Sequence, residues 1–279
     1  MSKLFATTLF IVFSLTAVFS QGVYNPKEMN NGAKGVLFNK EFAAELQLNT
    51  NGNSLGVNLG KLRTYYKTTF YHISIGELKH SKEYKNREDI RTSNFQENSR
   101  SYVFGKQNNL YALRVGMGVK KYLSEKARRK GVAIGYSYEF GPTLGLLKPY
   151  YLELRRSEVN NIVLPTLVSE KFSAENAEVF LDPDRIFGAS SFVKGLSEVK
   201  PRPGIHLKGG IHFDWGAFDE FVKAIEIGVM ADVFFGEIDI MVDDIDLPTT
   251  RVGTILPENV KNQPFFINLY LSIQLGKRR

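Results

Sequence analysis

The stretch that decides the fold is Ile267-Asn268-Leu269-Tyr270-Leu271-Ser272-Ile273-Gln274-Leu275. Its odd-numbered positions are all apolar, and its even-numbered positions carry amide, hydroxyl or phenol groups. Successive side chains of a β-strand point to opposite faces, so this period of two predicts a strand with one apolar and one more polar face.

Seven earlier segments carry the same alternation, which gives an even count of eight. They lie at about 38–49, 54–60, 71–75, 111–119, 132–154, 205–215 and 225–235. The fifth is predicted as one long strand with its apolar parity kept through Leu154 and a bulge or bend at Gly141-Pro142. Turns are expected at 51–53, 62–64, 124–130 and 216–220, and long loops at about 80–106, 156–202 and 237–263. The loop at 156–202 is expected to hold a short helix around 173–179.

The N-terminus has the pattern of an export signal. Lys3 precedes an apolar run from Leu4 to Val18, and Ser20 offers a small residue before a cleavage site at Gln21. The predicted organisation is a signal peptide at 1–20, an N-terminal periplasmic segment at 21–34 and a β-barrel at 35–279. The chain has no cysteine, which excludes a lipoprotein anchor, disulfides and thiolate metal sites.

The positions that alternate with the apolar residues carry charged side chains, and these distinguish a soluble barrel from a membrane barrel. A soluble lipocalin-like barrel would place apolar residues inside, around a ligand. Here the opposite parity carries carboxylates and cations: Glu41, Glu45, Arg114, Glu139, Lys208, Asp214, Glu226 and Asp232. We therefore expect an all-β, eight-stranded antiparallel transmembrane β-barrel of a bacterial outer membrane, with long extracellular loops and short periplasmic turns.

Composition agrees with that prediction. Charged residues make up 23% of the chain and the mean hydropathy is −0.19, as expected when half of each strand faces a polar lumen. The pI is near 9.3, but the basic residues are spread out and no nucleic-acid module is present, so a nucleic-acid partner is not expected. Aromatic residues placed near strand ends suggest interfacial girdles: Tyr65, Tyr66, Tyr122, Tyr150, Tyr151, Trp215 and Phe265.

Several stretches resemble a largely uncharacterised family of outer-membrane β-barrel proteins of Bacteroidota. They are Gly60–Lys67, Glu77–Glu83, Ser101–Asn109, Leu147–Leu152 and Tyr270–Arg278. The resemblance covers nearly all of the chain after residue 20, although Ser81 stands where the family pattern often has proline. It implies the barrel fold, but does not decide whether the protein acts alone or as a subunit of a larger machine.

Three functions follow as hypotheses. The first is non-enzymatic: a structural or interaction subunit of an envelope complex, such as outer-membrane protein assembly or secretion machinery. Its expected partners are outer-membrane lipid and lipopolysaccharide together with an outer-membrane protein or surface lipoprotein. The second is a small solute pore, although an eight-stranded barrel is just wide enough for side chains to fill it, so a plugged lumen is favoured.

The third hypothesis is a lipid A-modifying enzyme that uses Ser81 as nucleophile and His80 as base, with Glu77 or Glu83 nearby. Adjacent residues of an extended strand point to opposite faces, so this pair would need a loop conformation.

No metal or cofactor is expected. His206 and His212 would lie about 20 Å apart along one strand, too far to share an ion, although inward-facing His72 could meet one of them. The acidic loop clusters at 182–184 and 243–246 lack the spacing of a calcium loop.

Overall fold

The computed structural model describes residues 38–64, 66–86, 100–123, 131–156, 166–217, 219–243 and 260–279. The predicted signal peptide, the segment at 21–34 and the turn at 124–130 lie outside these ranges. Among the described residues, no helix is long and apolar enough to cross a membrane.

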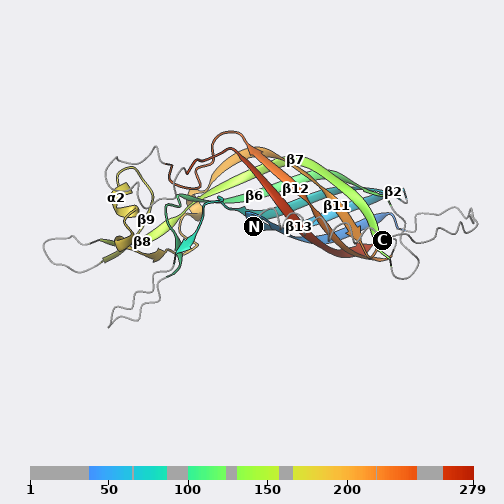
Figure 1. The fold of residues 1–279 in the computed structure, drawn as a ribbon, viewed down its shortest axis with the longest axis horizontal. Helices are drawn as coiled ribbons and strands as arrows, with labels where there is room; N and C mark the ends of the chain where they lie inside the picture. The colour runs from blue at the N-terminus through green and yellow to red at the C-terminus, as the bar shows by residue number, and fades with distance from the viewer. Residues whose placement is uncertain are drawn as a thin grey trace, which may run out of the picture. The chain divides into compact units, whose positions relative to one another are not determined.

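Eight antiparallel strands form one closed barrel in the order β1-β13-β12-β11-β7-β6-β3-β2, which confirms the predicted fold (Figure 1). The strands are β1 (Lys40–Asn49), β2 (Gly52–Thr64), β3 (Lys67–Leu78), β6 (Asn108–Tyr122), β7 (Ala133–Pro149), β11 (Lys200–Asp214), β12 (Phe221–Phe234) and β13 (Phe265–Arg278). The first and last strands close the sheet, with pairs that run from Glu41 opposite Arg278 to Asn49 opposite Tyr270.

Two local predictions were wrong. The turn expected at 62–64 belongs to β2, which continues to Thr64 and pairs there with Lys67 after a register shift at Leu62. At Gly141-Pro142, where a bulge or bend was expected, β7 keeps one register along β11 and therefore has no bulge. Proline has no N–H to donate, and the pairing of β7 with β6 is interrupted opposite Pro142 and resumes in the same register.

The two faces of the barrel differ as the alternation predicts. In β13, Ile267, Leu269 and Leu275 are 60–64% exposed on the outer face, while Asn268 and Ser272 are completely buried on the inner face. The same contrast holds along the other strands, whose outward residues are mainly leucine, isoleucine, valine and aromatics. The barrel therefore has an apolar outer wall and a polar interior.

The strand connections differ strongly between the two ends of the barrel. At one end, here called the turn end, β2 meets β3 and β11 meets β12 through short connections, and the chain terminus Arg279 lies beside Lys40. At the other, the loop end, the long connections 79–107, 150–199 and 235–264 emerge together with the tight β1–β2 turn.

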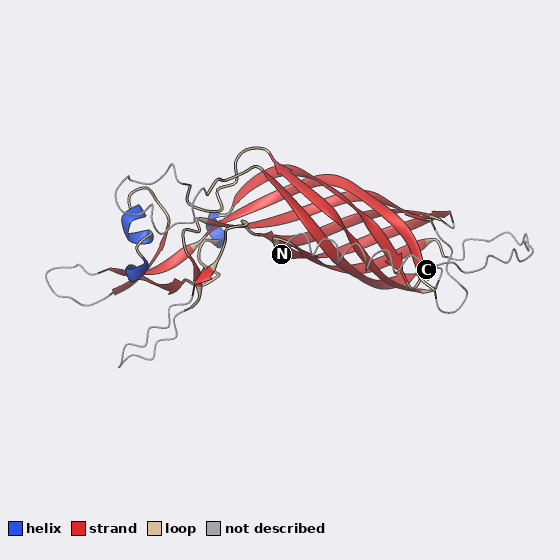
Figure 2. Ribbon diagram, viewed as in Figure 1, coloured by secondary structure: helices blue, strands red, loops and turns tan. Residues whose placement is uncertain are grey.

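The long connections build a folded extension at the loop end (Figure 2). Its elements are β4 (Lys85–Asn86), β5 (Tyr102–Val103), β8 (Tyr151–Arg156), β9 (Thr166–Lys171), β10 (Ile186–Ala189), α2 (Ala177–Phe180) and the 3₁₀ turns η1 (Pro183–Arg185) and η2 (Leu196–Glu198). Strands β10, β8 and β9 form a three-stranded sheet in that order. The helix expected at 173–179 is present as the single turn α2.

The extension has its own hydrophobic core, contributed by all three long connections: Tyr102, Phe104, Leu152, Leu154, Phe180, Leu181, Ile186 and Val242. Leu152 and Leu154 were expected on the outer face of a continued barrel strand, but both are completely buried here. The reason is that β7 ends at Pro149, after which the chain leaves the barrel wall and pairs with β9 and β10.

An apolar layer closes the loop end of the lumen. Ile238, Ile240 and Met241 from the last long connection pack among inward residues at the ends of the strands. Those strand residues are Leu78, Leu110, Ala112, Leu147, Phe234 and Phe266. Hydrogen bonds from Gln107 N to Ile240 O (2.8 Å) and from Asn262 Nδ2 to Met241 O (2.8 Å) hold the segment in the mouth of the barrel.

Substitution of Phe180 by alanine tests whether the extension is an independent packed unit. Phe180 is completely buried, so the substitution should cost about 3–5 kcal/mol of local stability through the cavity that it leaves. In detergent micelles, limited proteolysis should cut the variant within 150–199, while the barrel keeps the heat-modifiable gel mobility of the wild type. The matched control Leu167→Ala removes an exposed side chain and should leave the digestion pattern unchanged. Equal protease resistance of wild type and Phe180→Ala would contradict an independent core.

Candidate functional site

The chemistry-bearing side chains gather in the lumen, and the first cluster lies near the turn end. Arg278 Nε donates to Glu41 at 2.8 Å, and its Nη2 donates to Asp214 at 2.7 Å. Tyr122 Oη donates to the same carboxylate at 2.8 Å. Lys120 Nζ lies 3.3 Å from Glu41. These contacts tie β1, β6, β11 and β13 together across the barrel.

A second cluster surrounds Glu45 in the middle of the lumen. Lys208 Nζ forms an ion pair with one carboxylate oxygen. Asn58 Nδ2 donates to the other at 2.6 Å, and Gln274 Nε2 donates to it at 3.1 Å. Lys208 also lies 4.7 Å from the ring centre of Tyr270. The cation is thus surrounded by a carboxylate and an aromatic face, which offset its loss of water.

The lumenal histidines each contact a carboxylate. His72 Nδ1 and His206 Nε2 both approach Glu139 Oε1, at 2.7 and 3.1 Å. A carboxylate accepts hydrogen bonds, so both ring nitrogens donate. His206 therefore meets His72 through Glu139, which agrees with the prediction that His72 could meet a histidine of β11. His212 contacts Glu226 at 3.1 Å.

A third cluster lies nearer the loop end. Arg114 Nε and Nη2 donate to the two oxygens of Asp232 at 2.7 and 2.9 Å. Both side chains are almost completely buried. Two parallel charge-assisted hydrogen bonds make this the geometrically best-defined ion pair of the lumen.

The eight lumenal residues predicted from parity all lie in this network, and each is at most 4% exposed. Each contacts an oppositely charged or hydrogen-bonding side chain: Glu41, Glu45, Arg114, Glu139, Lys208, Asp214, Glu226 and Asp232. Side chains of opposite walls therefore meet across the interior. Together with the apolar layer at the mouth, this network places paired side chains across the interior of the barrel.

Sequence reasoning missed two members of the network. Arg278 was grouped with the basic chain end, although it shares the inward parity of Gln274 and would have been found by extending that pattern. Tyr122 was assigned to an interfacial girdle, but it is 7% exposed and its hydroxyl reaches Asp214 inside the lumen. A strand-end aromatic faces inward or outward according to parity, and parity places Tyr122 with Lys120.

His80 and Ser81 lie at the loop end, just beyond β3, but they are not arranged as a base and nucleophile. His80 Nδ1 accepts from the backbone N–H of Lys82 at 3.2 Å, and Nε2 lies 3.4 Å from the carbonyl oxygen of Lys261. Glu83 accepts from the backbone N–H of His80 and pairs with Lys106 at 2.6 Å, so it does not orient the imidazole. Within the described ranges, no hydrogen bond joins Ser81 to His80. With Nδ1 already accepting, the ring has no free acceptor for a hydroxyl proton.

The described residues contain no group of three or more histidine, aspartate or glutamate side chains placed to hold a metal ion. Asp182 is engaged otherwise: it accepts from Asp184 N at 3.1 Å at the start of η1 and lies 3.2 Å from Arg185. Residues 244–246 of the other acidic cluster lie outside the described ranges.

The extension carries its own ion pairs. Arg156 donates to both oxygens of Glu170, at 2.9 and 2.7 Å, and joins β8 to β9. These hydrogen bonds hold the pKa of the Glu170 carboxyl below its usual value. A depressed carboxyl pKa stabilises the fold above the unfolded value near 4.3, and that contribution is lost as the pH falls through the folded pKa. The Glu170 carboxyl is therefore charged at neutral pH, and its ion pair with Arg156 contributes fully to the contact between β8 and β9 there.

Searches against protein-family models, curated proteins and solved structures found no match to this chain. The resemblance to a Bacteroidota family thus remains a prediction.

Substitution of the Arg114–Asp232 ion pair tests whether the lumenal network stabilises the fold. Replacing Asp232 by leucine leaves the Arg114 charge buried without its partner and should cost about 3–5 kcal/mol. The double variant Arg114→Met, Asp232→Leu removes both charges and should recover most of that loss. Urea unfolding in lipid vesicles, followed by the fluorescence of Trp215, measures the difference. Equal stability of the single variant and the wild type would contradict the structural role.

Proposed function

We propose that this protein is an outer-membrane β-barrel that serves as a structural or interaction subunit of an envelope complex. The apolar outer wall, the export signal predicted at 1–20 and the confinement of long connections to one end support the membrane setting. On this view the turn end lies in the periplasm and the loop end outside the cell.

The observation that carries the interaction role is the folded extension. Three connections contribute to one buried core, and the extension holds a three-stranded sheet, a helical turn and a bidentate ion pair. Loops that only connect strands need none of this. A rigid, exposed platform fits a protein that is anchored by its barrel and binds a partner through its outer surface.

The side chains in the lumen favour the subunit role over a solute pore. Charged pairs and hydrogen-bonded side chains fill the interior, and Ile238, Ile240 and Met241 block its mouth. The contacts of His80 do not support the lipid A hypothesis, because both of its ring nitrogens face backbone groups.

Strand β9 is one of the two edge strands of the extension sheet and offers a docking edge for a partner; at the other edge, Ala189 N of β10 donates to Arg100 O at 3.4 Å. In the described sheet it pairs with β8 on one side only. Leu167 and Val168, which are 43% and 40% exposed, lie along it. An open strand edge with exposed apolar side chains can accept an extended segment of a partner protein by strand addition. The expected partner is another outer-membrane protein or a surface lipoprotein.

Capture of a stoichiometric partner tests this proposal. The tagged full-length protein is extracted from outer membranes in mild detergent, and co-purifying proteins are quantified by mass spectrometry. The variant Leu167→Lys, Val168→Lys places two charges on the β9 edge and should lower the recovery of the partner at least tenfold. Its matched control, Val193→Lys, Leu196→Lys, changes two exposed apolar residues elsewhere in the extension and should keep the partner.

A wild-type protein that elutes without a stoichiometric partner would overturn the subunit role. Loss of the partner in the control but not in the β9 variant would move the interface away from β9.

A further inference from the structure

A group of basic side chains surrounds the turn end of the barrel on its outer face. Six of the eight strands place an outward, exposed lysine within three residues of their turn-end terminus. Arg63 and Arg279 add two more cations beside them. We call this set the basic belt: Lys40, Lys61, Arg63, Lys67, Lys121, Lys223, Lys277 and Arg279.

The described residues form no comparable belt at the loop end. The outward parity there carries Lys79 just beyond β3 and Lys148 near the end of β7, and Lys200 is exposed at the start of β11. Lys79 pairs with Glu77 at 3.5 Å, and Lys148 is 4% exposed with its ammonium 4.6 Å from the ring centre of Phe192. The difference cannot be explained by solubility of an exposed rim alone, because both ends of the barrel face water beyond the strand ends.

Most belt cations lack an acidic partner within the described ranges. Lys277 pairs with Glu220 at 2.8 Å, but this is the one ion pair that a belt residue makes there. Arg63 donates to the hydroxyl of Thr69 at 3.2 Å. In the lumen, by contrast, each lysine and arginine of the network faces a carboxylate. The belt therefore presents a net positive charge that the carboxylates of the described residues do not neutralise.

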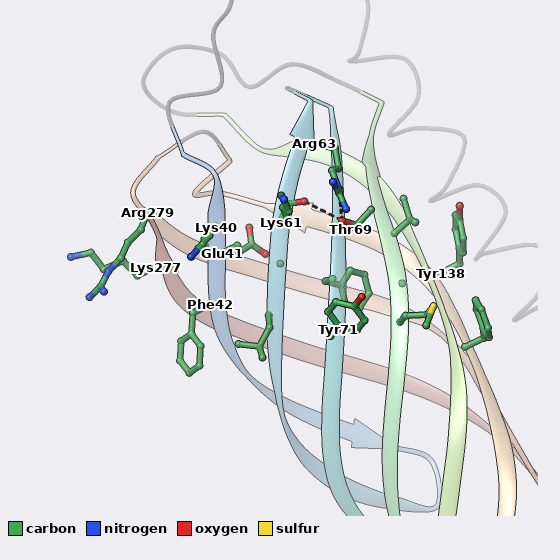
Figure 3. A pocket seen from close by; sticks show the side chains of 17 residues that line it. Lys40, Glu41, Phe42, Lys61, Arg63, Thr69, Tyr71, Tyr138, Lys277 and Arg279 are labelled. Carbon is green, nitrogen blue, oxygen red and sulfur yellow. Dashed lines mark hydrogen bonds between the residues drawn. The ribbon is translucent and has the colours of Figure 1, made fainter.

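Apolar and aromatic side chains lie next to the belt on the loop-end side. The open pocket in Figure 3 combines both kinds of residue on the outer wall. Lys40, Lys61 and Arg63 lie at its upper edge, and Phe42 and Tyr71 lie below them. This order, cations at the strand ends and apolar rings toward the middle, matches a phospholipid with its phosphate at the rim and its acyl chains along the wall.

We propose that the basic belt binds the phosphate groups of anionic phospholipids in the leaflet that surrounds the turn end. The inference rests on the proposed membrane location. With the short turns in the periplasm, the belt meets the periplasmic leaflet, which consists of phospholipids, and not the lipopolysaccharide of the outer leaflet. Basic residues near an anionic membrane surface attract its lipids, each changing binding by about fivefold. The belt thereby fixes the depth and orientation of the barrel.

Lipid retention by the purified full-length protein tests the proposal. The protein is mixed in nonionic detergent with equal amounts of dioleoyl phosphatidylglycerol and dioleoyl phosphatidylcholine, and bound lipid is counted by native mass spectrometry. The wild type should retain phosphatidylglycerol preferentially, and retention should fall as salt is raised. The variant Lys40→Gln, Lys61→Gln, Arg63→Gln should lose about tenfold or more of that retention.

The control Lys85→Gln, Lys194→Gln, Lys261→Gln removes the same charge from exposed positions of the loop end and should behave as the wild type. If the first variant does not fold, as judged by heat-modifiable mobility, Lys67→Gln, Lys121→Gln replaces a directly paired couple on β3 and β6. Unchanged phosphatidylglycerol retention in a folded belt variant would overturn the proposal, as would a wild type without preference. In a parallel sample with added lipopolysaccharide, a folded belt variant that loses lipopolysaccharide but keeps phosphatidylglycerol would also overturn it.

Cell fractionation distinguishes a failure of the lipid-binding proposal from a failure of the proposed membrane location. Absence of the wild type from the outer membrane would contradict the membrane setting, whatever lipid the purified protein retains.

Discussion

Closure of the sheet between β1 and β13 is the constraint on which the rest of the structure depends. An open sheet edge would leave backbone N–H and C=O groups without partners in an apolar surrounding, and closure satisfies them. Once the sheet is closed, each strand has one inward and one outward face, and the alternating sequence decides which residues share the lumen. The glutamates, lysines and histidines must then meet in a narrow space, where they are stable only as pairs. The filled lumen thus follows from the closure.

Closure of the sheet also explains why the two ends of the barrel differ in structure. Paired side chains cross the lumen, and the features that distinguish the two ends lie outside the barrel interior. At the loop end, three connections form a core of their own, and the last of them packs into the barrel mouth. At the turn end, connections are short and the outer rim is basic. The protein therefore combines a closed barrel, a packed extension at one end and a basic rim at the other, and the proposed subunit role rests on this arrangement.

The sequence was most informative where one physical rule dominates. A period of two decides on which side of the sheet each side chain lies. The barrel, its eight strands and the inward position of residues such as Arg114 and Asp232 were therefore predictable. The sequence was less informative where the direction of a side chain depends on the residue at which a strand ends. Leu152 and Leu154 continue the alternation of β7, yet the chain leaves the barrel at Pro149 and buries both. The pairing of His72 with His206 through Glu139 depends on the register between strands, which no single strand encodes. The core of the extension joins residues 102 to 242, and local patterns do not contain contacts of that range.

The most direct test of the central claim uses the absence of cysteine from the chain, since a single introduced cysteine labels one site. Spin labels placed one at a time from residue 267 to residue 275, in protein reconstituted in lipid vesicles, report contact with lipid-soluble oxygen and with a water-soluble nickel complex. The structure predicts high oxygen contact at odd positions, low contact with both reagents at even positions, and a period of two along the strand. Equal values along the strand, or nickel contact at the odd positions, would contradict a barrel with an apolar outer wall set in lipid.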